Sequence, residues 1–520
     1  MGISADSIAA GVSTELYGKN FKPSITRLER KPILFGAFNP ALTGISANDI
    51  YTVNSPEHAG ALFGFGYELH RMVLTFFKNW NGSSIDVIPV AEGSSAAAGA
   101  IIYSGTVEKS GTLRLYVSSD SVPVSVVKND APATVATLVA AAINADHNLP
   151  VTAAVDSEVT TKVNLTAKSK GLNGNKISVA HCLGFQEEMP SGLSAEVTAM
   201  ADGAGVSNIS DAVDALGTGT NQNQNYYTGG VACSGMDSDS LDILSVYNGE
   251  VGENPTGNHD GEVSRFFQFI NAYTDAGSGN LTTLQGVTAL RKEDNTNCCV
   301  YVPGSATHPV EIACAVLGQR ELMAIDRPES TIVDVILKGV MPGSDTDDFN
   351  GNSNLNTQCV KQGISTVRKD GTYTRMQDLV SFYRPDSVSV SSNIWRSLRH
   401  QAVSQNITEA CKKRFSLEKW KNITIVQDTS RVTNETAKEK AREKGDVISE
   451  LISLARSFES LGWLYSSDFT ISKLTKSPDD YVSVRTGGKG FNYKLPIIYS
   501  GEGGIISGEI WADANTDAAA

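Results

Sequence analysis

Hydrophobic positions in the first part of the chain follow the periods of buried strands and of amphipathic helices. Residues 31–36 and 85–90 are short, largely apolar runs of the kind that form buried strands. Between them, Ser55 and Pro56 are typical of a capped helix start. Residues 67–79 then place apolar side chains on one helical face, namely Leu69, Met72, Val73, Phe76 and Phe77. This β-α-α-β order predicts an α/β layer.

The next segment has a different pattern, and two stretches of small residues, 92–99 and 201–205, separate it from its surroundings. Inside it, strict alternation predicts strands, and a run without alternation predicts one helix near 132–144. The predicted strands are 112–117, 122–127, 151–155 and 162–167. We therefore expect a small α+β module inserted into the α/β layer.

After residue 226 the α/β pattern resumes. Predicted strands lie at 226–232, 297–302 and 332–337, with helices between and around them near 240–246, 261–273 and 309–323. Residues 363–384 then read as a strand, a turn at Asp370-Gly371 and a returning strand, because Asp-Gly between alternating β-formers is a strong hairpin signal.

The last third predicts a helix at 386–411, a strand at 423–426 and one long helix from Asn434 to Gly462. Further strands are expected at 481–485, 494–499 and 505–511. The first half of the long helix carries the basic side chains Lys438, Lys440, Arg442 and Lys444. They form either an ordinary solvated face with acidic neighbours or a contact with a neighbouring subunit or an inner tube.

Composition narrows the function classes. The 520 residues suffice for two to four domains, and 41% hydrophobic with 19% charged residues is ordinary for a globular protein. The net charge of −14, without a long Lys/Arg run, argues against nucleic-acid binding. No stretch of about 18 to 20 apolar residues predicts a membrane span. Seven scattered cysteines without a Cys-x-x-Cys pair are expected to be buried small hydrophobes: Cys182, Cys233, Cys298, Cys299, Cys314, Cys359 and Cys411.

Motifs for chemistry are incomplete. Gly64-Phe65-Gly66 begins a dinucleotide-type pattern, but Leu69 stands where its third glycine belongs. His308 and Glu311 could suit a metal, although a helix cap is the simpler interpretation. Residues 345–351 resemble a calcium loop, yet Phe349 occupies a position that needs an oxygen ligand. No catalytic, cofactor-binding or metal-binding residue is therefore predicted, and no cofactor is expected.

Several stretches together carry a resemblance to a known family. They are Pro32-Ile33-Leu34-Phe35-Gly36, the segments 61–66, 88–90, 96–99, 115–117, 141–145, 149–153 and 170–175, Ile325-Asp326-Arg327-Pro328, and the hairpin at 363–384. In these the chain resembles contractile phage tail sheath proteins of the Mu-like type. The hairpin is the most specific piece.

The resemblance implies a structural protein and not an enzyme. It implies hexameric discs stacked as a helical sheath around a tail tube, with the tube, baseplate and tail terminator proteins as partners and with neither nucleic acid nor membrane. Contraction would drive the tube through the host envelope for genome ejection. The protein would be part of the virion tail and be made in the host cytoplasm.

In related sheaths, both terminal arms add a strand to a neighbouring subunit. The corresponding apolar residues here are Ile3, Ile8, Val12, Leu16, Ile505, Ile506, Ile510 and Trp511.

The predicted fold class is accordingly α/β and α+β multidomain. Its α/β middle domain (26–92 and 204–385) carries an inserted β-rich α+β domain (93–203), which could be surface decoration or an exposed binding domain. An α+β C-terminal assembly domain (386–500) follows, between the arms 1–25 and 501–520. Two alternatives stay open: the sheath of a headless, tailocin-like injection particle, and a soluble α/β hydrolase.

Overall fold

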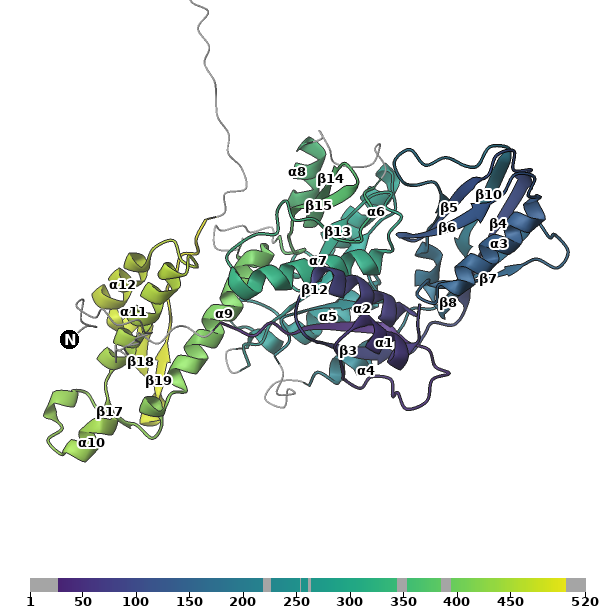
Figure 1. Ribbon diagram of the computed structural model, residues 1–520. Coiled ribbons are helices and arrows are strands. Elements are labelled where there is room, and N and C mark those ends of the chain that lie inside the picture. Colours follow the sequence, from purple (N-terminus) through teal and green to yellow (C-terminus); the bar gives the residue numbers. More distant parts are fainter. Residues whose placement is uncertain are drawn as a thin grey trace, which may run out of the picture.

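The computed structural model describes residues 27–217, 226–252, 254–260, 263–343, 353–384 and 394–501. Three regions follow one another along an elongated molecule (Figure 1). A large central sheet with its helices lies in the middle, a module of antiparallel strands lies at one end, and a smaller, mainly helical region lies at the other end.

The central region is built on one mixed sheet. Its strand order is β15-β14-β13-β12-β11-β1-β3-β2, and all neighbouring pairs are parallel except the two outermost ones. The strands are β1 (Pro32–Ala37), β2 (Tyr51–Val53), β3 (Ile85–Val90), β11 (Gly229–Ala232), β12 (Gln268–Tyr273), β13 (Asn297–Tyr301), β14 (Ile364–Asp370) and β15 (Tyr373–Asp378). The central strands are buried, apart from the half-buried Tyr273 at the end of β12, because helices cover both faces.

Alternate residues of β13 show how the two faces are covered. Cys298 and Val300 belong to the core beneath α2 and α7, whereas Cys299 and Tyr301 pack with side chains from α5 and α6. The helices of this region are α1 (Pro56–Phe63), α2 (Glu68–Asn79), α4 (Ser210–Asp214), α5 (Ser238–Asn248), α6 (Ser278–Ala289), α7 (Pro309–Asp326) and α8 (Ser353–Lys361). Ser55 accepts a hydrogen bond from the His58 N–H, as the predicted cap of α1 requires.

Residues 96–201 form two antiparallel sheets with their own core. One sheet has the order β10-β4-β8-β7 and the other β6-β5-β9. The strands are β4 (Ala96–Gly105), β5 (Gly111–Val117), β6 (Asp120–Val126), β7 (Val151–Val155), β8 (Lys162–Lys170), β9 (Val179–His181) and β10 (Leu193–Ala201), and helix α3 spans Pro132–Ala145. We call this segment the module.

Charged side chains fasten the module to the central region. Arg71 of α2 forms a bidentate ion pair with Glu311 of α7 at 2.8 and 2.9 Å, and it also contacts Asp120 of the module at 2.5 Å. Asn173 donates to Glu68, which is the first residue of α2. Arg71 and Asn173 are therefore two points at which side chains connect the module with α2.

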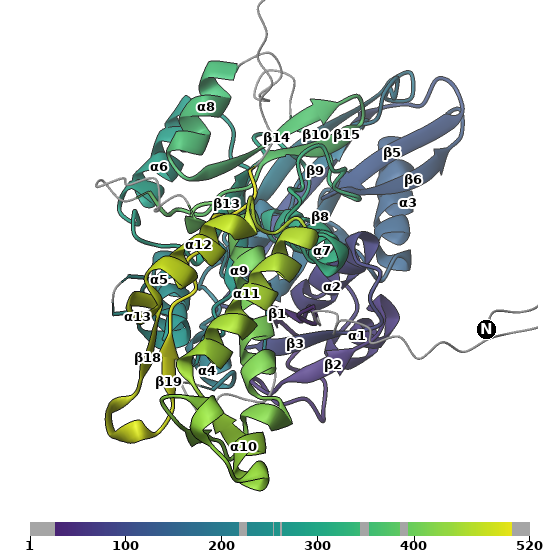
Figure 2. The same ribbon diagram turned by 90° about the vertical axis from the view of Figure 1, so that its left-hand side faces the viewer.

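The C-terminal region begins with α9 (Leu398–Phe415), which runs out from the central region (Figure 1). Helix α11 lies beside α9 (Figure 2), and their shared core includes Val403, Ile407, Leu454 and Phe458. The other elements are β16 (Thr424–Ile425), α10 (Glu435–Lys440), β17 (Ala441–Arg442), α11 (Lys444–Ser460), α12 (Ser467–Lys476), α13 (Pro478–Tyr481), β18 (Val482–Val484) and β19 (Phe491–Tyr493).

The single long helix predicted from Asn434 to Gly462 is wrong. Asn434 does cap a helix, α10, but that helix ends at Lys440 because β17 pairs with β16. Glu443 then begins α11 through a capping box with Asp446. Helical periodicity continues across the break, so the pattern alone could not reveal it.

Other predicted elements also differ from those in the structure. The helix expected at 261–273 is wrong, because 268–273 is the buried strand β12. At 332–337, Ile336 makes only an isolated bridge, since Asp334 adopts a positive φ of 68°. Residues 494–499 make one bridge, from Tyr499 to Leu464, and the ordered strand is β19 just before them.

The predicted mixed α/β fold with several sheets is confirmed, including the hairpin β14–β15. The domain boundaries themselves stay a prediction.

Candidate assembly site

Helix α9 holds the segments at which the described chain starts and stops. On the N-terminal side, the Leu28 N–H donates to Asn406 Oδ1 at 2.9 Å. On the C-terminal side, Arg399 donates to the carbonyls of Ser500 and Gly501 at 2.8 and 3.1 Å. Arg399 and Asn406 are seven residues apart, which is about 10 Å along a helix axis. One short stretch of α9 therefore holds both Leu28 and the segment Ser500–Gly501.

A buried charge cluster fixes the N-terminal segment. Arg30 forms a bidentate ion pair with Glu321 of α7, at 2.8 and 3.0 Å, and donates to Gln405 of α9 at 2.9 Å. Arg320 also pairs with Glu321. Burial raises the pKa of Glu321, but the two guanidinium groups outweigh burial and bring that pKa to about 2. This carboxylate therefore stays charged and holds Arg30 on α7, while Gln405 connects Arg30 with α9.

The predicted arm residues lie outside the described part of the chain. They are Ile3, Ile8, Val12, Leu16, Ile505, Ile506, Ile510 and Trp511. Their role as strand arms stays a prediction, and the structure describes only the segments from which they continue.

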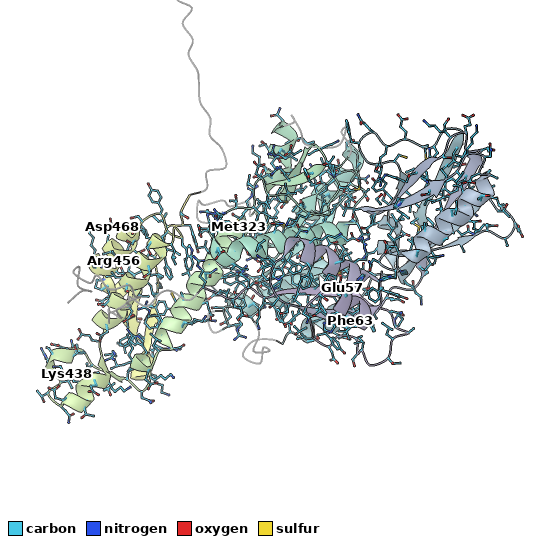
Figure 3. The ribbon with its side chains drawn as sticks, in the orientation of Figure 1. Glu57, Phe63, Met323, Lys438, Arg456 and Asp468 are labelled. Carbon is cyan, nitrogen blue, oxygen red and sulfur yellow. The ribbon has the colours of Figure 1, made fainter. Side chains whose placement is uncertain are left out.

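The four predicted basic contact residues lie around α10. Arg442 donates to the Lys419 carbonyl at 3.0 Å, and its guanidinium lies 5.9 Å from the centre of the Trp420 ring. Lys440 pairs with Glu418 at 3.9 Å, and Lys444 pairs with Asp479 at 2.6 Å. Lys438 is exposed at the outer end of the C-terminal region (Figure 3). Three of the four cations therefore already have intramolecular contacts.

A two-stranded ribbon lies next to α11 and α13. Strands β18 and β19 pair antiparallel with each other, from Val482–Tyr493 to Val484–Phe491, and with no other strand in the described residues. Their outer backbone groups are therefore available to a further strand. Sequence reasoning placed this ribbon only approximately, because its three-residue strands carry almost no periodic signal.

His308 and Glu311 have structural roles. His308 caps α7 by accepting from the Val310 N–H, and its Nε2 donates to the Asn173 carbonyl at 3.0 Å. Its neighbour Glu311 is engaged by Arg71. The predicted cap is confirmed. The calcium-like loop at 345–351 lies outside the described residues.

Six of the seven cysteines are buried, and Cys182 is half-buried. Burial raises the pKa of Cys233 well above its usual value, so this thiol stays protonated and unreactive. Within the described residues, no group of three or more His, Cys, Asp and Glu side chains could hold a metal ion. No helix of the described ranges is long and apolar enough to cross a membrane.

Comparison with known proteins gives one sequence relative. The chain is 32% identical over 173 residues to the Mu-like prophage FluMu tail sheath protein of Haemophilus influenzae. The alignment covers 33% of this chain and 35% of the relative, so the chain spans about a third of the length of the curated relative it matches. The resemblance to Mu-like tail sheaths is confirmed in that aligned part. No family model matches the chain.

Several solved structures of sheath proteins show a distant similarity to this chain. A sheath tail protein of Desulfitobacterium hafniense is 9% identical, with a TM-score of 0.43 over 93% of this chain and 100% of that one. The contracted PVC sheath of an extracellular contractile injection system is 10% identical, with a TM-score of 0.47 over 97% and 99%. The contracted helical sheath of the anti-feeding prophage is 12% identical, with a TM-score of 0.40 over 97% and 100%. Because each of these TM-scores is below 0.5, no further conclusion about this chain rests on the three structures.

Proposed function

We propose that this chain is the structural subunit of a contractile tail sheath. It polymerises around a tail tube, and its contraction drives the tube through the host envelope for genome ejection. The observation that carries the proposal is the sequence similarity to the FluMu tail sheath protein. The role is mechanical and not enzymatic, and its place is the virion tail after synthesis in the host cytoplasm. Baseplate and tail terminator proteins would bound the sheath at its two ends.

Helix α9 supports a specific assembly mechanism. The terminal segments 1–25 and 501–520 would extend from its surface to a neighbouring subunit and add strands to the open ribbon β18–β19. Ordering such a segment costs more conformational entropy than its few apolar residues recover alone. The arms would therefore order only where a neighbour offers an edge, which makes assembly depend on a template.

Each of the three proposed domains would have its own place in the sheath. The middle domain (26–92 and 204–385) would form the body of the sheath, the inserted domain (93–203) its outer surface, and the domain 386–500 its connected inner layer. Contraction would then be a rotation of rigid subunits while the arms keep them linked. The buried pair between Arg71 and Glu311, with Asp120, supports movement of module and body together.

Assembly can be tested by negative-stain microscopy of the purified protein. Unaltered protein should form long helical sleeves, whereas Ile506→Asp and Ile510→Asp should leave soluble monomers, because a charge cannot pack against a neighbour's sheet. Thr516→Asp, in the polar run after Trp511, is the matched control and should still assemble. Discrete particles from unaltered protein would count against a sheath, and normal sleeves from both Ile variants would count against strand exchange.

The basic side chains give a finer proposal. Because Lys440, Arg442 and Lys444 already have intramolecular contacts, Lys438 is the residue we expect to contact the tube or a neighbouring subunit. Lys438→Glu should reduce co-sedimentation with purified tail tube protein, and Lys109→Glu, an exposed lysine of the module, should not. Equal co-sedimentation of both variants would remove Lys438 from the contact.

A further inference from the structure

A cavity of about 290 Å³ lies beside the start of α9. Its walls come from the first turn of α9, from the end of α7 with the segment that follows it, and from the end of β15. One wall residue, Arg399, donates to the carbonyls of Ser500 and Gly501 at 2.8 and 3.1 Å. Gly501, the last described residue, therefore lies at the wall of this cavity.

Basic side chains dominate the charged lining of the cavity. Arg320, Arg396 and Arg399 border it, whereas Asp378 is the one carboxylate among the described residues that line it. Arg320 is paired with Glu321, so Arg396 and Arg399 supply positive charge against Asp378 alone. The first turn of α9 contains no acidic side chain, and the helix dipole therefore adds to the positive potential.

Arg396 has no salt bridge within the described part of the chain. Its guanidinium donates to a neutral acceptor, the Val360 carbonyl. Burial and the neighbouring Arg384 lower the pKa of Arg396, whereas Asp378 acts in the opposite direction. Positive charge is thus crowded at this place and partly removed from water. A carboxylate that reached Arg396 would form a charge-assisted hydrogen bond and offset both effects.

The chain itself supplies a carboxylate next to this cavity. Glu502 follows Gly501 directly in the sequence, and consecutive Cα atoms are only about 3.8 Å apart. It is also the first acidic residue after Asp480. Gly503 and Gly504 come next, and glycines let the backbone turn in almost any direction. The sequence after the last described residue therefore matches the cavity in charge and in reach.

We propose that the cavity binds the Glu502 carboxylate of the same chain, with Arg396 as its ion-pair partner. The contact would anchor the C-terminal segment on α9 and leave residues 505–520 available to a neighbouring subunit. Because Arg30 joins α9 to α7, a pull on the anchored segment would be passed on to the body of the subunit. The contact does not require the sheath role, but this mechanical consequence rests on the proposed function.

Amide hydrogen exchange on unassembled full-length protein tests the contact. The readout is the amides of Tyr465 and Ser500, whose hydrogen bonds to the Ile498 and Trp463 carbonyls open when the C-terminal segment detaches. Glu502→Gln should speed their exchange about three- to tenfold, the range for losing one partly buried charge contact near a helix N-terminus.

Three further variants make the test specific. Arg396→Gln should speed exchange as much as Glu502→Gln, and the double variant should show no larger change, because both substitutions remove the same ion pair. Glu509→Gln in the same terminal segment and Arg456→Gln on the exposed side of α11 (Figure 3) are the matched controls and should exchange like the unaltered protein.

Glu502→Gln keeps the test decisive even where Arg396→Gln fails to fold. Unchanged exchange in Glu502→Gln would overturn the contact. Protection that rises with protein concentration would place Glu502 of another copy in the cavity and would equally overturn docking within one chain. Negative-stain microscopy of the same preparations separates this inference from the sheath role: sleeves without an effect of Glu502→Gln refute only the contact, and an effect without sleeves supports the contact alone.

Discussion

Replacing single members of the Arg30–Glu321–Arg320 cluster should have unequal effects on stability. The Arg30 and Glu321 side chains are 1% and 0% exposed, and the single Glu321 carboxylate pairs with two guanidinium groups. Arg30→Met leaves a neutral pair of Glu321 with Arg320. Glu321→Gln leaves two buried cations with no opposing charge. Glu321→Gln should therefore be the more damaging change, although it alters the side chain less.

The magnitudes follow from the number of attractions lost. At an effective dielectric constant of 20, one pair at about 4 Å contributes about 4 kcal/mol before desolvation is counted. Breaking a buried pair typically costs about 3–5 kcal/mol net. Because Glu321→Gln loses both attractions, we expect the upper end of that range. Arg30→Met loses one attraction and its hydrogen bond to Gln405 but leaves no uncompensated charge, so it should cost less than the lower end of that range, about 3 kcal/mol.

Amide hydrogen exchange along α7 and α9 measures these costs, because it reports local opening of the two helices that the cluster joins. The control is Arg27→Met, which removes an exposed pair with Asp326 and should cost less than about 1 kcal/mol. If Arg30→Met costs as much as Glu321→Gln, the argument from uncompensated charge is refuted. If Arg27→Met costs as much as Arg30→Met, burial does not decide the effect.

Two further predictions concern acid and backbone strain. Glu321 has a pKa of about 2 in the folded protein, below its usual 4.5, so its stabilisation is full above about pH 4.5 and disappears as the pH falls toward 2. The difference in urea midpoint between unaltered protein and Glu321→Gln should shrink from about pH 5 to about pH 3, and a constant difference would contradict this. Gly105→Ala should destabilise by at least about 1–3 kcal/mol, because φ is +81° and a Cβ would overlap a backbone carbonyl. Gly111→Ala, which meets no atom within 4 Å, should stay within about 0.5 kcal/mol in the same thermal unfolding series.

Local signals in the sequence predicted the elements whose patterns are unambiguous. Ser55-Pro56 gives the cap and first turn of α1, and Asp370-Gly371 gives the β14–β15 hairpin. Elements buried on both faces were harder to assign as helix or strand from the sequence. Residues 268–273 are apolar enough for either a buried helix or a strand, and only their pairing with β11 and β13 makes them β12.

The candidate sites depended more on the fold. Residue types and spacing indicated basic side chains near 438–444, but they could not show that Arg442 turns onto Trp420 or that β17 interrupts the helix. The ion pair of Arg30 with Glu321 was not predicted at all, because the two residues lie 291 positions apart and no local signal connects them.

The sequence by itself determined the alternation of strands and helices, the inserted module, the absence of a complete catalytic motif and the resemblance to tail sheaths, because these rest on local periodicity and on short contiguous segments. Only the tertiary structure decided that Arg30 meets Glu321, that Leu28 and Ser500 both contact α9, and that residues of the module and of the central sheet line one cavity. Those contacts join residues up to several hundred positions apart, and their free energy comes from burial and charge pairing that exist only once the chain is packed.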